Sequence, residues 1–270
     1  MTGMEILKKL QLREEIYEAV CRMELPKLEL KFENYEENLE KLTPIANENS
    51  GLLIFRYFLE LSAELKRRYD VLGISEEVFL DNIKDLALWA EDYYVKHGRP
   101  GFAAWRWVFM TLSMKVFRLG RLQFEPTQLY KKLSCGDKVF PVGTPVLSVH
   151  IPAGEPLNIA AVKESFLKAP QFFKDYFNES FDYFYCHSWL VSPELKSILP
   201  AESGIIQFQS MFNVCEVDNG RQAEERVFGF LADNPAEYPE KTSLQRKMKA
   251  ELAAGNHFGR GFAIFPIDKA

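Results

Sequence analysis

The segment "SVHIPAGEPLN" at residues 148–158 joins a histidine, a broken loop and the start of a helical pattern. A neutral imidazole such as that of His150 can take a proton from an amine near neutral pH. A helix that begins near residue 157 would direct free backbone N–H groups at an anion. The same residues also fit a hydrogen-bonded strand histidine followed by a turn in which Glu155 caps the helix. The segment alone leaves both interpretations open.

A second segment with reactive side chains is "FDYFYCHSWLV" at residues 181–191. In a strand, Tyr185 and His187 share one face and Cys186 points to the opposite face. Cys186 and His187 are therefore not expected to form a nucleophile–base pair. Tyr185 and His187 could line a cleft, with the tyrosine as an acid, or they could belong to an aromatic face that packs under a helix.

The segment "FRLGRLQFE" at residues 117–125 is the first extended-looking run. As one strand it places Arg121, Gln123 and Glu125 on one side and Arg118 on the other. Two arginines on a strand could bind a carboxylate or phosphate, or they could form salt bridges with neighbouring elements. Gly120 between them suggests a bulge or a close backbone approach.

Several classes of protein are disfavoured by the sequence. Dinucleotide-binding, P-loop, nucleophile-elbow and zinc-protease motifs are absent, and the four histidines are too scattered for a zinc site. The net charge of −5 gives no general attraction to nucleic acid. No apolar run reaches the roughly 18 residues of a membrane span. The four cysteines form no CxxC pair, so we expect free thiols in a reduced, cytoplasmic setting.

The elements that must position these residues fall into two regions. Helical spacing of apolar residues covers 52–72 and 76–97, each ended by a glycine, and continues into 101–117. We expect a helical N-terminal domain over residues 1–113.

Residues 114–270 mix strands and helices, which predicts an α+β domain. We expect helices from residue 158, from Pro170 as a separate short helix, at 193–199, at 221–230 and at 242–254. Strands are expected at residues 117–125, 144–151, 181–191, 205–214 and 259–267. The strand at 205–214 is predicted from the alternation of Ile206, Phe208 and Phe212.

The order of these elements is similar to the GNAT N-acyltransferase fold. The phrases "RLGRLQFE", "VHIPAGEPL" and "FDYFYCHSWL" resemble bacterial acyltransferase-like proteins with a helical N-terminal domain and a GNAT-like C-terminal domain. The resemblance implies a mixed, mostly antiparallel sheet flanked by helices. It also implies acetyl-CoA or another acyl-CoA as co-substrate, no metal, and a small amine as acceptor.

The resemblance assigns roles to individual residues. The pantetheine would lie where the first histidine-bearing strand parts from the second, and the pyrophosphate would lie at the following helix. The implied residues are His150 as base, helped by Glu125 or His187, Tyr185 as acid, Arg121 and Gln123 toward the amine, and Ile151, Pro152, Ala153, Gly154, Leu157 and Asn158 toward the acyl-CoA.

The sequence departs from the general GNAT pattern in two places. "PAGEPLN" lacks the glycine-rich phosphate loop, and "SPELKSIL" lacks the tyrosine that often protonates the departing thiolate. Three hypotheses follow: an acyl-CoA-dependent N-acyltransferase; a GNAT-shaped binding or regulatory module without transfer activity; and a thiol enzyme that pairs Cys135 with a histidine. We expect a small-molecule partner, no nucleic acid or membrane, and a possible homodimer.

Overall fold

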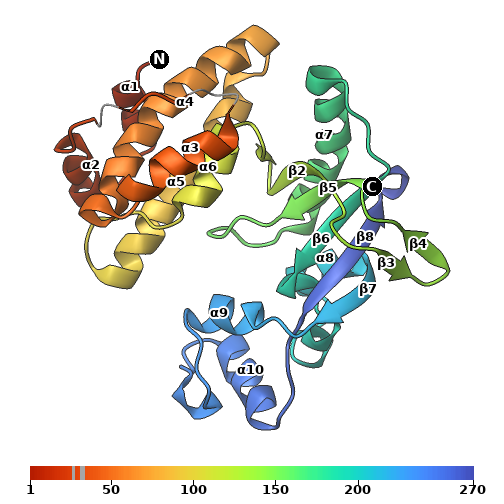
Figure 1. The fold of residues 1–270 in the computed structure, drawn as a ribbon. Coiled ribbons are helices and arrows are strands. Elements are labelled where there is room, and N and C mark those ends of the chain that lie inside the picture. Colours follow the sequence, from red (N-terminus) through yellow and green to blue (C-terminus); the bar gives the residue numbers. More distant parts are fainter. Residues whose placement is uncertain (26–27, 31–33) are drawn as a thin grey trace. The chain divides into compact units, whose positions relative to one another are not determined.

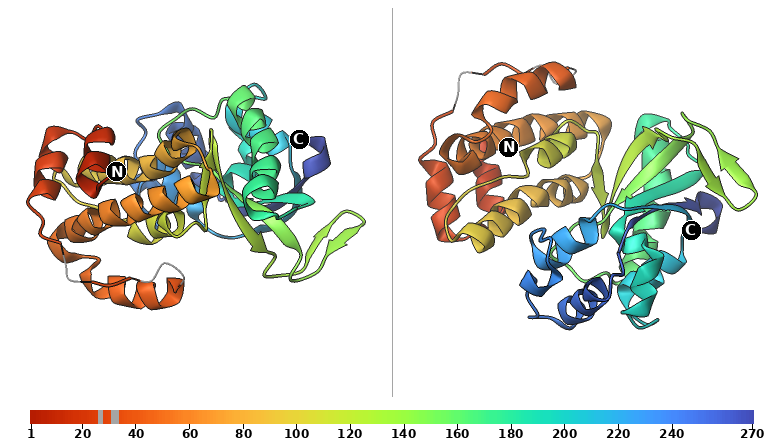
Figure 2. Two further views of the ribbon diagram at one scale, coloured as in Figure 1. Left: turned by 90° about the horizontal axis from the view of Figure 1, so that it is seen from above. Right: turned by 60° about the horizontal axis from the view of Figure 1, so that its bottom comes forward.

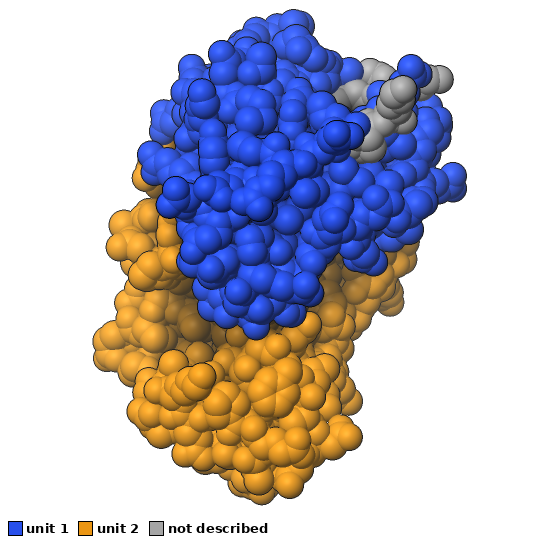
Figure 3. Space-filling view, turned by 90° about the vertical axis from the view of Figure 1, so that its left-hand side faces the viewer, with its two compact units in different colours: residues 1–119 blue, residues 120–270 orange. Residues whose placement is uncertain are grey.

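The computed structural model describes residues 1–25, 28–30 and 34–270 of the chain. These residues form two compact units, residues 1–119 and 120–270, which Figure 3 distinguishes by colour. The boundary between the two units lies after Leu119, and the domain boundary expected after residue 113 stays a prediction. Each unit has a core of its own and is described by itself.

The described part of the first unit is almost entirely helical. Its elements are α1 (Gly3–Lys9), α2 (Glu14–Cys21), α3 (Tyr35–Leu42), α4 (Leu52–Leu72), α5 (Glu76–His97), α6 (Trp105–Leu112) and the short strand β1 (Phe117–Leu119). The two long helices have the predicted bounds: Gly73 ends α4 with a φ of 77°, and the Ser75 side chain caps α5. Asn82 on α5 exchanges two hydrogen bonds with the backbone of Arg118, and these anchor β1.

The second unit is built on a mixed sheet. Its strands are β2 (Leu122–Gln128), β3 (Leu133–Cys135), β4 (Lys138–Phe140), β5 (Pro145–His150), β6 (Tyr183–Ser188), β7 (Asn213–Asp218) and β8 (Arg260–Pro266). Within this unit the sheet order is β2–β5–β6–β8–β7, and β3 pairs with β4 separately. Only β5 and β6 are parallel among these pairs. The predicted α+β class and mostly antiparallel sheet are confirmed.

The helices of the second unit are α7 (Ile159–Phe177), α8 (Gly204–Ser210), α9 (Gln222–Phe228) and α10 (Ser243–Ala253), with 3₁₀ turns at Trp189–Val191 and Pro193–Ser197. In this unit, α7 lies along the sheet, whereas α9 and α10 pack together away from the strands (Figure 1). The capping box of Thr242 and Gln245 starts α10 as predicted. The short helix expected at 193–199 is present as the second 3₁₀ turn.

One face of the sheet is covered by α7. The Phe166 ring on this helix lies 6.1 Å from Phe124 on β2, 4.6 Å from Phe184 on β6 and 5.3 Å from Phe265 on β8, between ring centroids. All these side chains are buried. Strand alternation places the apolar halves of β2, β5, β6 and β8 on this face, which we call the aromatic face.

The opposite face carries the polar residues of the same strands, and we call it the polar face. Residues 129–144, with β3 and β4 at their centre, form an arm that projects from the sheet (Figures 1 and 2). Its base is closed by two backbone hydrogen bonds: the N–H of Leu129 donates to the Thr144 carbonyl, and the N–H of Gly143 donates to the Leu129 carbonyl. Leu133 and Phe140 of the arm pack with Tyr185, Phe262 and Ile264 on the polar face. The arm therefore covers part of this face with apolar side chains.

The prediction that Pro170 begins a separate helix is wrong. Pro170 lies inside the single helix α7, although it has no N–H to donate to the preceding turn. Phe166 and Ala169 before it, and Phe173 after it, are all completely buried. Because one continuous apolar stripe packs on the sheet, burial outweighs the missing hydrogen bond.

The strand predicted at residues 205–214 is also wrong. Residues 204–210 form α8, and only the last part belongs to a strand, β7. The Ser203 side chain caps α8 at the N–H of Ile206. Gln209, which alternation places on the face opposite Phe208, is buried and donates a hydrogen bond to the Ser192 carbonyl. The alternating pattern was short enough to fit either structure.

Two other strands are shorter than predicted. Residues 117–125 do not form one strand, because a turn at residues 120–121, with Gly120 at a φ of 80°, separates β1 from β2. A left-handed backbone angle of this kind suits glycine. Trp189 lies in a 3₁₀ turn and does not extend β6.

We predict that Phe166→Ala lowers the free energy of unfolding by about 3–5 kcal/mol, because it removes a buried ring that contacts three strands. The neighbouring Leu167 has 63% of its surface exposed, so Leu167→Ala is the matched control and should change stability by less than about 0.5 kcal/mol. Urea unfolding of both variants measures the difference. Equal losses would show that α7 does not hold this face.

Candidate functional site

The parallel pairing of β5 with β6 ends early. Leu147 pairs with Phe184 and Ser148 with Tyr185, and the register includes no later pair. Beyond Tyr185, β6 continues to pair with β8 on its other side. We call the end of the β5–β6 ladder the strand fork. It leaves backbone groups of β5 without a partner in β6.

A histidine stands on each strand just beyond the strand fork. His150 lies two residues after Ser148, and His187 lies two residues after Tyr185. Since side chains two residues apart point to the same face of a strand, both imidazoles belong to the polar face. The structure thus brings together two histidines from strands that are distant in the sequence.

His150 is paired with the carboxylate that the sequence analysis named. Its Nε2 lies 2.9 Å from Oε2 of Glu125 on β2. The two side chains are 29% and 26% exposed, so the pair remains accessible to a small molecule. Gln123 pairs with His150 across the ladder and is buried. Glu125, Gln123 and His150 therefore share one edge of the strand fork.

His187 is paired with a carboxylate that the sequence analysis did not name. Its Nε2 lies 3.1 Å from Oδ2 of Asp218, and Asp218 in turn receives two hydrogen bonds from Arg260, at 3.0 and 2.7 Å. The imidazole stacks on the ring of Phe262, with centroids 3.8 Å apart. Burial lowers the pKa of His187, against the opposing effect of Asp218. The Arg260 guanidinium holds the pKa of Asp218 well below its usual range.

Tyr185 precedes His187 by two residues on the same face. Its side chain packs in the apolar cluster beneath the arm, and burial raises its pKa. The hydroxyl therefore stays protonated in the neutral range and can donate a hydrogen bond. The ring is therefore buried under the arm and not under a helix, and its expected role in lining a cleft stays a prediction.

The loop after β5 is held by Arg121. The guanidinium donates hydrogen bonds to the carbonyls of Glu155, at 2.7 Å, and Pro156, at 3.1 Å, and its own backbone N–H is bound by Ser165 on α7. Arg121 is buried. This arginine therefore positions the loop, and the role toward an amine that the resemblance implies stays a prediction.

The remaining loop residues surround the start of α7. Asn158 caps the helix, and its side chain accepts hydrogen bonds from the N–H groups of Ala160 and Ala161. The helix cap is thus the side-chain amide of Asn158, in place of the Glu155 carboxylate. Pro152 is buried, and Ile151 and Leu157 are half-buried, whereas Ala153 and Gly154 are exposed. These six residues lie together between the strand fork and the helix.

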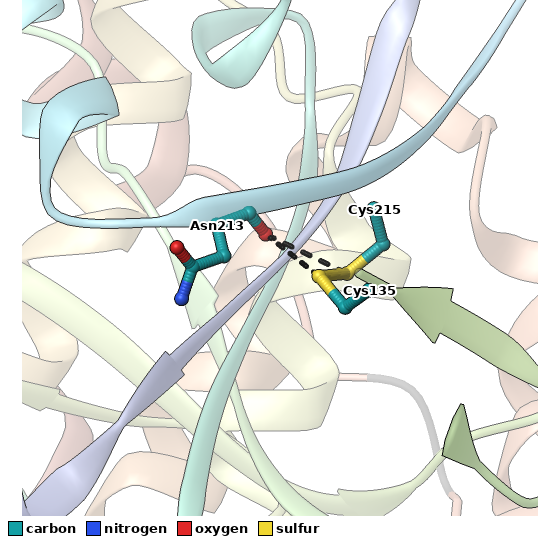
Figure 4. Close-up of a disulfide and its surroundings, with 3 residues drawn as sticks. All are labelled: Cys135, Asn213 and Cys215. Atoms are coloured by element: carbon teal, nitrogen blue, oxygen red, sulfur yellow. Dashed lines mark hydrogen bonds between the residues drawn. A yellow bond between two sulfur atoms is a disulfide. The ribbon is translucent and has the colours of Figure 1, made fainter. Parts of the chain in front are cut away.

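The expectation that all four cysteines are free is wrong. Cys135 on β3 and Cys215 on β7 form a disulfide, although 80 residues separate them (Figure 4). Their Cα atoms are 4.4 Å apart because the arm folds back to the edge strand. The bond ties the arm to the sheet edge next to Asn213, a proximity that no local pattern in the sequence indicates.

The thiol hypothesis loses its nucleophile in this structure. The sulfur of Cys135 is bonded to Cys215, so it cannot pair with a histidine as a free thiol. Cys21 and Cys186 are the free cysteines. Burial raises the pKa of Cys186 to about 12, which makes it a poor nucleophile at neutral pH. Cys21 lies on α2 in the other unit.

The described side chains contain no cluster of three or more histidines, cysteines, aspartates or glutamates placed to bind a metal. Across residues 1–25, 28–30 and 34–270, no helix has both the length and the apolar character needed to cross a bilayer.

Asp218 and Arg260 are the residues that sequence reasoning missed. Arg260 opens the predicted last strand, and Asp218 follows the segment misread as one strand at 205–214. The strand pairing of β7 with β8 brings them opposite each other. A correct boundary for β7 was the missing signal, because it would have placed Asp218 at the end of a strand.

Comparison with known families identifies the class of protein. Residues 1–114 match the family model of the N-acyltransferase N-terminal domain, and residues 116–265 match the GNAT-like C-terminal domain. The chain belongs to the family that joins these two domains, as the resemblance in the sequence implied.

Solved structures share this fold over nearly the whole chain. An acyltransferase in complex with decanoyl-CoA and teicoplanin has a TM-score of 0.76 at 23% identity, and the match covers 97% of this chain and 87% of the other. An acyltransferase in complex with CoA and 10C-teicoplanin has a TM-score of 0.77 at 23% identity, with the same two coverages. No curated protein matches the sequence at a significant level.

The lowered pKa of His187 predicts a pH effect on stability. Its folded-state pKa lies below the ordinary value of about 6.5, so the unfolded chain binds a proton that the folded chain does not. As pH falls below about 6.5, protonation of His187 in the unfolded chain therefore lowers the stability of the fold. The loss grows until the pH reaches the folded-state pKa and stays constant below it. We expect the loss to be smaller in His187→Gln.

NMR titration of histidine-labelled protein, with His187→Gln to assign the resonance, measures the pKa directly. Urea unfolding at a series of pH values on either side of neutrality measures the stability of both proteins. A His187 midpoint above about 6.5 would contradict the argument from burial.

Proposed function

We propose that the protein is an acyl-CoA-dependent N-acyltransferase that moves an acyl group from a CoA thioester to a small amine. The observation that carries the proposal is the strand fork with an imidazole on each of its strands. Membership of the N-acyltransferase family supports it, and so do the similar solved acyltransferases, which hold CoA or acyl-CoA.

The proposed reaction is direct transfer. The amine nitrogen attacks the thioester carbonyl carbon, the C–S bond breaks, and an amide and the CoA thiol form. A base must take one proton from the amine nitrogen, and the thiolate must gain one. His150 and His187 are the candidate bases, with Glu125 paired to the first. Tyr185, kept protonated by burial, is the candidate donor to the thiolate.

The loop and the β5 backbone are proposed to hold the acyl-CoA. Beyond Ser148, backbone groups of β5 have no partner in β6, and they could pair with the pantetheine amides. The exposed residues Ala153 and Gly154 are proposed to lie near the pyrophosphate. Arg121 contributes by fixing the two loop carbonyls, so that the loop keeps one conformation.

One observation favours the second candidate, a GNAT-shaped binding or regulatory module. Asn158 occupies two N–H groups at the start of α7 that a pyrophosphate would otherwise use. A phosphate must displace this side chain or use other groups of the loop. Such a self-capped helix weakens CoA binding relative to an open one.

Calorimetry with acetyl-CoA, octanoyl-CoA and decanoyl-CoA, followed by assay of an amine panel for released thiol, distinguishes the two candidates. The transferase should bind at least one thioester and release its thiol in the presence of an amine. Absence of binding at millimolar concentration overturns the proposal. Binding of a thioester without turnover over the whole panel favours the module.

We predict that loss of the accepting imidazole lowers kcat by roughly 10²–10⁴-fold while CoA affinity stays nearly unchanged. The kcat values of His150→Gln, His187→Gln and the double variant show which imidazole accepts the proton. His97→Gln on α5 is the matched control, since it removes a histidine from the other unit. An unchanged rate in His150→Gln removes His150 from the mechanism.

A further inference from the structure

We propose that Asp218 and Arg260 are positioning residues that hold His187 with its proton on Nε2, so that Nδ1 accepts the proton of the amine. This inference rests on the proposed function and makes His187 the base.

The hydrogen bonds around Asp218 fix the tautomer of His187. Arg260 Nε and Nη2 and the N–H of Gly220 all donate to this carboxylate, at distances of 3.0, 2.7 and 2.8 Å. A carboxylate surrounded by donors is ionised and can only accept hydrogen bonds. His187 Nε2, 3.1 Å from Asp218 Oδ2, must therefore carry the proton. Nδ1 of the neutral ring then has a free lone pair.

The strand register places this cluster on the polar face. Asp218 on β7 is opposite Arg260 on β8, and His187 on β6 is opposite Phe262 on β8. A register shift between Val214 and Glu216 inserts one extra residue into β7. In an uninterrupted ladder, Val217 would stand opposite Arg260, and the carboxylate would miss the guanidinium. The bulge therefore aims Asp218 at its partners.

Nδ1 of His187 remains available to a substrate. Within the part of the chain that the structure describes, His187 makes its hydrogen bond through Nε2, and no group is bonded to Nδ1. Its side chain is 18% exposed, so solvent reaches part of the ring. Stacking on Phe262 fixes the plane of the ring. Nδ1 of His187 is therefore an acceptor whose lone pair has a fixed direction, and it lies next to the strand fork.

The anchoring of Asp218 bears on how well His187 can act as a base. Asp218 has three donors besides His187. A base needs one tautomer and one orientation, because a misplaced proton blocks the transfer. The contacts of Asp218 give His187 both.

The charges around His187 set the pH range of the base. Burial lowers its pKa, Arg260 on β8 and Lys131 in the arm lower it further, and Asp218 on β7 raises it. The ring is therefore neutral at neutral pH. Lys131 is itself paired with Glu216, at 2.6 Å.

Asp218→Asn and Arg260→Gln should move the acid limb of the kcat/KM profile in opposite directions. Loss of the carboxylate disfavours the imidazolium, lowers the pKa of His187 and moves the limb to lower pH. Loss of the guanidinium favours the imidazolium and moves the limb to higher pH. Arg260→Lys keeps the charge and should move the limb less than Arg260→Gln. Shifts in the same direction for Asp218→Asn and Arg260→Gln would overturn the proposal.

The plateau rate reports the tautomer. In Asp218→Asn the side-chain amide that replaces the carboxylate can donate to Nε2 and so place the proton on Nδ1. We therefore expect this variant to lower plateau kcat by about 10–100-fold. Glu225→Gln, which changes an exposed carboxylate on α9, is the matched control and should keep the plateau rate. A plateau in Asp218→Asn equal to that of the wild type overturns the positioning role.

The ¹⁵N chemical shifts of His187 test the tautomer without any turnover. The wild-type protein should show protonated Nε2 and unprotonated Nδ1, and Asp218→Asn should show a mixture or the reverse. A wild-type Nδ1–H tautomer overturns the inference even if the protein is an active transferase. If the predicted tautomer is found in a protein that turns over no thioester, the positioning by Asp218 stands, and the proposed function and the role of His187 as base fail.

Discussion

The arrangement of the second unit depends on a parallel strand pair that stops after two residue pairs. β5 and β6 are held together at Leu147 and Ser148, and the side chains of Leu147 and its partner Phe184 are completely buried. Past that point each strand keeps only its outer neighbour, β2 or β8. Backbone groups that a continuous ladder would pair internally are thereby released, and buried or half-buried groups of this kind require another partner. The strand fork is consequently a place where an extended ligand can add to β5.

The aromatic face of the sheet stabilises the fold, and the polar face carries the side chains of the candidate site. On the aromatic face, Phe166 and its neighbours exclude water and fix the strands. On the polar face, the same strands present Glu125, His150, Tyr185 and His187, and the arm covers only part of them. Because side chains alternate along each strand, a residue that anchors the core lies next to one that faces the site. Rigid strands therefore position the imidazoles.

Much of the fold could be predicted from the sequence, because its signals are local. The spacing of apolar residues and terminal caps defined α4, α5 and α10, and the GNAT-like phrases indicated the order of strands around the site. The predicted elements were wrong where the local sequence pattern fitted two structures about equally well. Pro170 stays inside α7, and residues 204–210 form a helix, because burial against the sheet outweighs local preferences. The disulfide of Cys135 and Cys215 was missed because it joins distant segments.

The candidate site depends even more than the fold on contacts between segments that are distant in the sequence. By itself the sequence determined which strands carry His150 and His187 and which side chains share a face within each strand, since these follow from alternation, and the resemblance added Glu125 or His187 as the helper of His150. Only the tertiary structure decided that Arg121 holds the loop, that Asn158 caps α7, and that Asp218 and Arg260 meet at His187. The physical reason is register. A single extra residue in β7 changes which side chains face β8, and pairing between distant strands, which no short stretch of sequence encodes, sets that register.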